Sequence, residues 1–153
     1  MAMQSGRCEV KAVRDLWHVL GAIDELPRGK VKRTTLLGEP VAFARDTAGA
    51  IHVWRAQADL KDGSVFTPQL AADPLPVKQA YGYLWTSLGT PTADLFPMPE
   101  YAEPDRRSMN AATFYVHVSA PRAVENFLDM GHFPFVHTNY LGVESHPEVK
   151  DYT

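Results

Sequence analysis

Residues 125–137 of the chain read ENFLDMGHFPFVH and carry its clearest chemical pattern. Within nine residues the segment places the carboxylate of Asp129 and the imidazoles of His132 and His137 among phenylalanine, leucine and valine. Buried polar groups of this kind cost desolvation free energy unless they are paired. The segment is therefore interpreted as a binding site rather than as part of a core.

A helix is predicted over about 121–133, because Pro121 suits the first turn of a helix. At about 100° per residue, Asp129 and His132 lie about 60° apart on this helix. Both side chains are then expected to face one site together with Asn126.

Pro134 is expected to bend or end the helix, because proline disfavours helical backbone at the preceding residue. The bend allows His137 to return to the side of His132. Two neutral imidazoles and a carboxylate, with open positions for oxygen, form the facial triad that binds non-haem Fe(II). A zinc hydrolase is a weaker alternative, because the His-x-x-x-x-His spacing lacks the glutamate of a helical zinc protease. The other histidines lack such neighbours and are interpreted as satisfied structural groups: His18, His52, His117 and His146.

The first half of the chain alternates between short β-prone runs and turn formers, which indicates a small antiparallel β domain. Asp46 to Gly49 is predicted to be a hairpin turn, since Gly49 can adopt the positive φ that closes it. Residues 55–76 are predicted to be loop with at most one short strand. The predicted strands are Trp17–Leu20, Val31–Leu37, Pro40–Arg45, Ala50–Trp54 and a last one within Val77–Leu88.

A connector with four prolines between residues 90 and 107 is predicted to separate this domain from the next. After it, residues 112–119 alternate apolar and polar side chains, as a half-buried strand does. Residues 150–153 show no cap or turn, and we expect the chain to stop within an element of the second domain.

The composition is that of an ordinary soluble globular protein: of 153 residues, 45% are hydrophobic and 22% are charged, and the formal net charge is −3. The chain has no dense cluster of lysine and arginine, which argues against a nucleic-acid surface. No apolar run approaches the ~20 residues of a membrane span, and residues 1–11 lack the apolar core of a signal peptide. A cytoplasmic location without membrane contact is predicted. The one cysteine, Cys8, excludes an intrachain disulfide and a multi-cysteine metal site.

The run Asn126-x-x-Asp129-x-x-His132-x-x-x-x-His137 resembles the mononuclear-iron motif in the catalytic (alpha) subunits of Rieske non-haem iron oxygenases. The resemblance covers roughly residues 17–153. The chain resembles members that demethylate methoxyaromatics or N-methylated purines more than it resembles ring-dihydroxylating members. The former are the vanillate and methylxanthine demethylase type. Upstream stretches resemble the edges of the family's Rieske domain: Trp17–Leu20, Leu37–Val41, Arg45-Asp46 with Gly49, and Tyr81–Trp85.

The resemblance implies a mostly β, α+β fold. An antiparallel Rieske-like β domain is followed by the start of a helix-grip (α/β sandwich) catalytic domain. The implied organisation is a leader over 1–14, the Rieske-like domain over 15–92, the connector over 93–108 and an incomplete iron domain over 109–153.

The resemblance also implies roles for the motif. His132 and His137 would be iron ligands, Asp129 the carboxylate that couples a Rieske cluster to the iron, and Asn126 a nearby site residue. A carboxylate that accepts a hydrogen bond from an imidazole fixes the tautomer of the ring and raises its basicity.

The chain departs from the family pattern in two ways. The family binds its [2Fe–2S] cluster with a Cys-x-His and a Cys-x-x-His pair, whereas this chain has only Cys8, and residues 55–76 contain neither cysteine nor histidine. No cluster is therefore predicted here, and a partner is expected to supply it. The family's third iron ligand, a carboxylate, falls beyond the end of the chain. The late acids are interpreted as surface residues: Glu144, Glu148 and Asp151.

Two hypotheses of function follow. In the first, the chain is part of an oxidoreductase with mononuclear Fe(II) that uses O2 to demethylate or hydroxylate an aromatic or heteroaromatic substrate. Electrons would come from a partner Rieske protein or ferredoxin-reductase system, within a homo- or hetero-oligomer of the trimeric ring type. In the second, the chain is a non-catalytic assembly or regulatory subunit, or a degenerate fragment, because the cluster and one iron ligand are missing.

Overall fold

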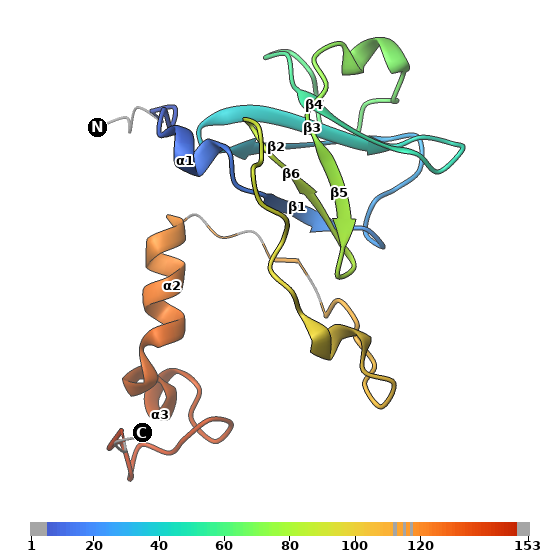
Figure 1. Ribbon diagram of the computed structural model, residues 1–153. Helices are drawn as coiled ribbons and strands as arrows, with labels where there is room; N and C mark the ends of the chain where they lie inside the picture. Colours follow the sequence, from blue (N-terminus) through green and yellow to red (C-terminus); the bar gives the residue numbers. More distant parts are fainter. Residues whose placement is uncertain (1–5, 112, 115, 117, 150–153) are drawn as a thin grey trace. The chain divides into compact units, whose positions relative to one another are not determined.

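The computed structural model describes residues 6–111, 113, 114, 116 and 118–149 (Figure 1). The chain divides into two compact units between Thr113 and Phe114.

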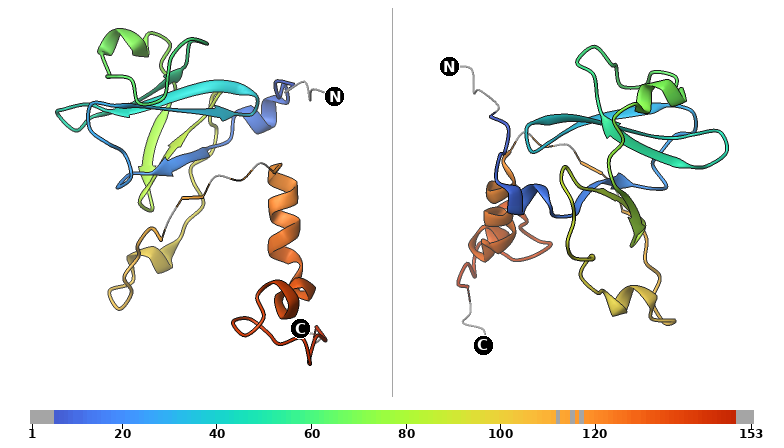
Figure 2. Two further views of the ribbon diagram at one scale, coloured as in Figure 1. Left: turned by 180° about the vertical axis from the view of Figure 1, so that it is seen from behind. Right: turned by 45° about the horizontal axis from the view of Figure 1, so that its top comes forward.

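The N-terminal unit contains two antiparallel sheets of three strands, with strand orders β2-β3-β4 and β1-β6-β5. Both views in Figure 2 show the β2-β3-β4 sheet between the second sheet and the loop that carries the short 3-10 helix η1. The described part of the unit is mostly β, as predicted. Its strands are β1 (His18–Ala22), β2 (Val31–Leu36), β3 (Glu39–Arg45), β4 (Ile51–Arg55), β5 (Val77–Ala80) and β6 (Tyr83–Thr86).

Strand β3 is buried on both faces, because alternate side chains enter two different cores. Val41 and Phe43 join a core that includes Leu84 of the second sheet. Ala42 and Ala44 point the other way, into a core around Trp54. The alanines leave room for the indole ring, so the central strand ties the two cores together.

The Trp54 core is closed by the segment between β4 and β5. Three side chains of this segment pack against the core: Leu60, Phe66 and Leu70. Leu70 belongs to η1 (Pro68–Ala71). Backbone bonds fasten the segment to the sheet, with Arg55 N donating to Asp73 O at 3.0 Å and Leu75 N donating to Val53 O at 2.9 Å. The described structure has no strand in this segment, in agreement with its prediction as loop.

Three hairpin turns join neighbouring strands, and the first, between β2 and β3, is formed by Leu37 (φ 50°) and Gly38 (φ 84°). Asp46 N donates to Ala50 O at 2.9 Å, and Gly49 has a φ of 101°, so the predicted turn is present. The prediction of one strand over 77–88 is wrong. Tyr81 (φ 57°) and Gly82 (φ 77°) both adopt positive φ, which closes a two-residue turn between β5 and β6.

The segment predicted as a leader is joined to the β unit in its described residues. It contains the short helix α1 (Lys11–Arg14). The carbonyl of Arg14 accepts from the Ser87 hydroxyl at 2.8 Å and from Gly89 N at 3.0 Å. The guanidinium of Arg14 pairs with Glu39, whose carboxylate is buried. The sequence pattern missed these bonds because their partners lie far away along the chain.

The connector contains a 3-10 turn, η2 (Pro99–Ala102), and is bonded to the second sheet. Trp17 Nε1 donates to Ala93 O at 3.0 Å, and the Tyr81 hydroxyl donates to Phe96 O at 2.7 Å.

The C-terminal unit contains α2 (Ala120–Leu128), η3 (Met130–His132) and α3 (Phe133–Val136). The predicted helix therefore ends at Leu128 rather than near Phe133. The strand predicted over 112–119 is not found in its described residues, while Ala112, Tyr115 and His117 lie outside them. In the part of the chain that the structure describes, no helix has the length and apolar character needed to cross a bilayer.

Candidate metal site

Asp129 ends helix α2 and begins the turn that carries the first histidine. Its backbone leaves the helical region (φ −79°, ψ 90°), and its Oδ1 accepts a hydrogen bond from Gly131 N at 2.9 Å. Aspartate competes in this way with helix continuation by bonding to nearby backbone. The expectation that Asp129 and His132 share one helical face is wrong for this reason.

His132 and His137 come together across the short helix α3. Their ring centroids lie 5.2 Å apart, with an angle of 62° between the ring planes. Pro134 occupies the first turn of α3, and His137 N donates to Phe133 O at 3.1 Å. The Phe133 ring meets both imidazoles edge-on, with centroid distances of 4.8 and 5.9 Å. The chain leaves the helical conformation before the first histidine, at Asp129. The expected bend at Pro134 is wrong, because Phe133 keeps helical backbone (φ −58°, ψ −46°) and Pro134 lies in the first turn of α3.

The two imidazoles differ in their surroundings. The His132 side chain is 14% exposed, and its Nδ1 is buried without a hydrogen-bond partner among the described residues. The nearest carboxylate oxygen recorded for it is Asp129 Oδ2, at 3.9 Å, which is too long for a hydrogen bond. His137 is exposed. A buried imidazole nitrogen without a partner is costly in a folded protein, and a bound group at His132 Nδ1 would remove this cost.

The spacing of the two rings suits a shared metal ion. A first-row ion at about 2.1 Å from a ring nitrogen lies roughly 3.2 Å from the ring centroid, so two rings on one ion have centroids about 4.5 to 6.4 Å apart. The observed separation is 5.2 Å. The separation of the rings is therefore compatible with two ligands of one iron ion.

A third ligand is not found with them. Over the described residues, no group of three or more histidine, cysteine, aspartate or glutamate side chains could hold a metal ion. Asn126 is an exposed residue of α2, Glu144 and Glu148 are exposed, and Asp151 lies outside the described residues.

The described residues of the β unit do not fit a [2Fe–2S] cluster. Cys8 is bonded through its backbone N to Leu37 O, and its free thiol belongs to the N-terminal segment. His18 Nε2 lies 2.9 Å from Val13 O, and His52 Nε2 lies 3.0 Å from Asp46 Oδ2. The segment that should carry the cluster ligands instead closes the Trp54 core.

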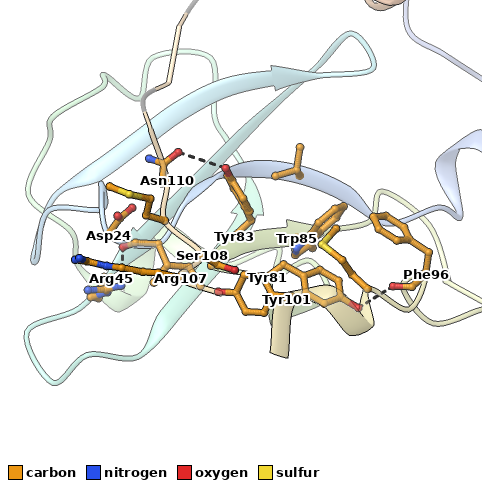
Figure 3. A pocket seen from close by; sticks show the side chains of 15 residues that line it. Asp24, Arg45, Tyr81, Tyr83, Trp85, Phe96, Tyr101, Arg107, Ser108 and Asn110 are labelled. Atoms are coloured by element: carbon orange, nitrogen blue, oxygen red, sulfur yellow. Dashed lines mark hydrogen bonds between the residues drawn. The ribbon is translucent and has the colours of Figure 1, made fainter. Parts of the chain in front are cut away.

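The β unit also has an aromatic groove of about 990 Å³, which the sequence analysis missed (Figure 3). Tyr81, Tyr83 and Trp85 line it from β6 and the preceding turn, at the alternate positions that share one strand face. The alternate spacing of these aromatic residues is a sequence signal for one wall of the groove. The opposite wall is formed by Phe96 and Tyr101 of the connector, which local spacing does not predict. Two polar side chains of the groove are already bonded: the Tyr83 hydroxyl donates to Asn110 Oδ1 at 3.3 Å, and Arg45 Nη2 donates to Ile23 O at 2.7 Å.

Residues 116–153 match the family model described as the vanillate O-demethylase oxygenase C-terminal domain. The chain is 38% identical to the probable methylxanthine N7-demethylase NdmC of Pseudomonas sp. (strain TJI-51) over 146 residues, which cover 92% of this chain and 45% of that protein. It is 26% identical over 174 residues to the toluene-4-sulfonate monooxygenase system iron-sulfur subunit TsaM1 of Comamonas testosteroni, covering 90% of this chain and 50% of that protein.

The chain is a Rieske oxygenase homologue. Two solved structures share the fold of this homologue. Pseudomonas putida CBB5 NdmA has a TM-score of 0.65 at 17% identity, covering 90% of this chain and 54% of that chain. Dicamba monooxygenase bound to dicamba has a TM-score of 0.61 at 20% identity, covering 82% and 48%. The homologue spans about half the length of the curated relatives that it matches.

Proposed function

We propose that this Rieske oxygenase homologue provides two nitrogen ligands, His132 and His137, to the mononuclear iron of an O2-dependent oxygenase. The observation that carries the proposal is the approach of the two rings to 5.2 Å between centroids. The pair lies within the segment that matches the oxygenase C-terminal domain model. We assign residues 15–92 to a Rieske-like domain without its cluster and residues 109–153 to the start of a helix-grip domain.

The residues around the pair prepare it for a metal. Phe133 packs against both rings and keeps water from one side of them. Asp129 orders the turn before His132, and a rotation of its carboxylate would close the 3.9 Å gap to His132 Nδ1. That hydrogen bond would fix the tautomer and leave Nε2 free as a ligand. Bound iron would supply the redox chemistry that activates O2.

We infer that the substrate is an aromatic or heteroaromatic molecule with an N- or O-methyl group. Two relatives support this class by name, a methylxanthine demethylase and a vanillate demethylase domain. Oxidative demethylation consumes O2, two electrons and two protons, and converts the methyl group to formaldehyde, with one water formed. Hydroxylation of the substrate is the other outcome of the same electron balance.

The electrons must come from another protein in this proposal. The described residues of the β unit hold no set of cysteine and histidine ligands for a cluster, so in this proposal the cluster that reduces the iron lies on a partner. A partner with a Rieske cluster, fed by a reductase, would dock within an oligomer and place its cluster near Asp129. The name of the Comamonas testosteroni relative, a subunit of a monooxygenase system, supports a multi-component arrangement.

Metal binding by the 153-residue chain tests the proposal. We expect the wild-type chain to bind one Fe(II), or Co(II) as a stable substitute, per chain under anaerobic conditions. The His132→Ala, His137→Ala double variant should lose this binding, whereas His146→Ala should keep it, because His146 is exposed and bonded to Ser145. Equal binding by the wild-type chain and the double variant would refute the metal site.

The second candidate function is a non-catalytic assembly subunit. The observation that favours it is the presence of only two metal ligands among the described residues. Turnover distinguishes the two functions. If the protein demethylates a methylxanthine or vanillate with a reductase and a Rieske donor, and without another oxygenase subunit, the assembly role is excluded.

A further inference from the structure

Residues 134–142 form a closed loop around the second histidine. Within the described part of the C-terminal unit, Pro134 is the residue classed as buried. Gly142 packs directly against it: a Cβ on Gly142 would lie 3.0 Å from Pro134 Cα, 3.1 Å from its N and 3.2 Å from its Cγ. These separations are tighter than ordinary carbon contacts, and two of the three atoms belong to the backbone. Any larger residue at position 142 therefore pushes the loop away from α3.

A backbone turn returns the chain to Pro134. Asn139 has a φ of 67°, a region that residues other than glycine, asparagine and aspartate rarely adopt. Asn139 N donates to Gly142 O at 2.7 Å, and Thr138 pairs with Gly142 in an isolated parallel bridge. The turn and the glycine contact thus depend on each other.

His137 is held by this loop on both sides. Its N–H donates to Phe133 O at 3.1 Å, while its carbonyl accepts from Tyr140 N at 3.1 Å and from Leu141 N at 2.9 Å. These bonds fix the backbone of His137 beside α3, and so limit where its ring can lie relative to His132.

We propose that Asn139 and Gly142 are positioning residues for the His132–His137 pair. They hold the loop against Pro134 and so keep the two rings at metal-sharing distance. This proposal deepens the proposed function, because it names what presets the metal site. Neither side chain has to touch the metal.

A matched pair of variants at position 139 separates backbone conformation from loss of the side chain. Asn139→Gly removes the amide and keeps access to positive φ, whereas Asn139→Val removes the amide and makes that conformation strained. We expect Asn139→Val to lower Co(II) affinity by about 10-fold or more, as loss of supporting contacts does at metal sites. Asn139→Gly should retain wild-type affinity and the wild-type visible spectrum of bound Co(II).

A second pair tests the glycine contact. Gly142→Ala should also weaken Co(II) binding, while Gly6→Ala should have no effect, because a Cβ at Gly6 meets no atom within 4 Å. Nuclear Overhauser contacts between the two imidazole rings, measured without metal, report ring proximity directly. We expect these contacts in the wild-type chain and in Asn139→Gly, and their loss in Asn139→Val and Gly142→Ala.

The outcomes separate this proposal from the metal site itself. If all four variants bind Co(II) as tightly as the wild-type chain and retain the ring contacts, the positioning role is overturned and the metal site stands. If the wild-type chain binds no metal through the pair, the proposed function fails, and the ring contacts alone still decide whether the loop positions the histidines.

Discussion

The two units differ in where they keep their apolar side chains. In the N-terminal unit Trp54 and Leu84 are almost completely buried, in two cores that share strand β3. In the C-terminal unit Phe127 and Leu128 of α2 are 76% and 73% exposed, and the candidate metal ligands are held by local backbone bonds. The comparison teaches that packing and the proposed metal site fall in different parts of this chain. The described β unit is built around two apolar cores, whereas turns hold the proposed histidine pair.

The largest expected effect is on the core of the β unit. Replacing Trp54 with alanine removes the side chain around which the β3–β4 sheet and the loop with η1 pack. We expect Trp54→Ala to lower the free energy of unfolding by about 3–5 kcal/mol, as for other buried aromatic residues. Urea unfolding followed by far-UV circular dichroism measures the change. Val65→Ala is the control, because Val65 is 65% exposed and its loss should change stability by less than about 0.5 kcal/mol.

The next effect concerns the buried carboxylate of Glu39. It lies 3.0 Å from Arg7 Nη2 and 3.5 Å from Arg55 Nε, and it also pairs with Arg14. Glu39→Gln leaves three guanidinium groups without their shared anion. We expect Glu39→Gln to lower the free energy of unfolding by about 2–3 kcal/mol. This is less than the roughly 3–5 kcal/mol lost when a fully buried ion pair is broken, because the guanidinium groups are partly solvated. Glu103→Gln, in an exposed ion pair with Arg106, should change stability by less than about 1 kcal/mol. Equal losses in the two variants would contradict the role of Glu39.

Glu39 also predicts a pH dependence. Burial alone would raise its pKa, but the Arg14 and Arg7 guanidiniums outweigh burial and hold the pKa below its ordinary value of 4.5. A carboxyl with a lowered folded pKa stabilises the fold above its unfolded pKa, and this stability is lost as pH falls through the folded pKa. Wild-type stability should therefore fall below about pH 4.5 more steeply than that of Glu39→Gln. Parallel stability curves for the two proteins would show that Glu39 does not titrate with folding.

The smallest effect is expected on the exposed face of α2. Phe127→Ala should change the unfolding free energy of the β unit by less than about 0.5 kcal/mol, because the ring is largely exposed in the described structure. The same substitution type at Leu84, which is fully buried, should cost about 2–5 kcal/mol. A large destabilisation by Phe127→Ala would show that the contrast between the units is wrong.

Local patterns predicted much of the β unit. Strands β2 to β4 and the turn at Asp46–Gly49 were foreseen, because alternation and a turn glycine are local signals. The turn at Tyr81–Gly82 was missed, because a tyrosine at positive φ goes against its intrinsic preference. The buried ion pairs of Glu39 were missed as well, because Arg7, Arg14 and Arg55 approach it only in the folded chain.

The sequence predicted that His132 and His137 approach each other, but it placed the break in the helix at the wrong residue. The sequence identified His132 and His137, and the structure brings their rings together. The helix was predicted to continue through Asp129, but the bond from Gly131 N to its carboxylate ends it there. A sequence pattern does not decide whether an aspartate lies within a continuing helix or ends the helix by capping the next turn. The same residue type is compatible with either structure.

Iron and acid-labile sulfide, measured together on the 153-residue chain after anaerobic loading with Fe(II), test the central claim most directly. We expect about one iron per chain, lost in the His132→Ala, His137→Ala variant, and no acid-labile sulfide, because the described β unit lacks cluster ligands. Iron that survives the double substitution, or sulfide in proportion to iron, would contradict it.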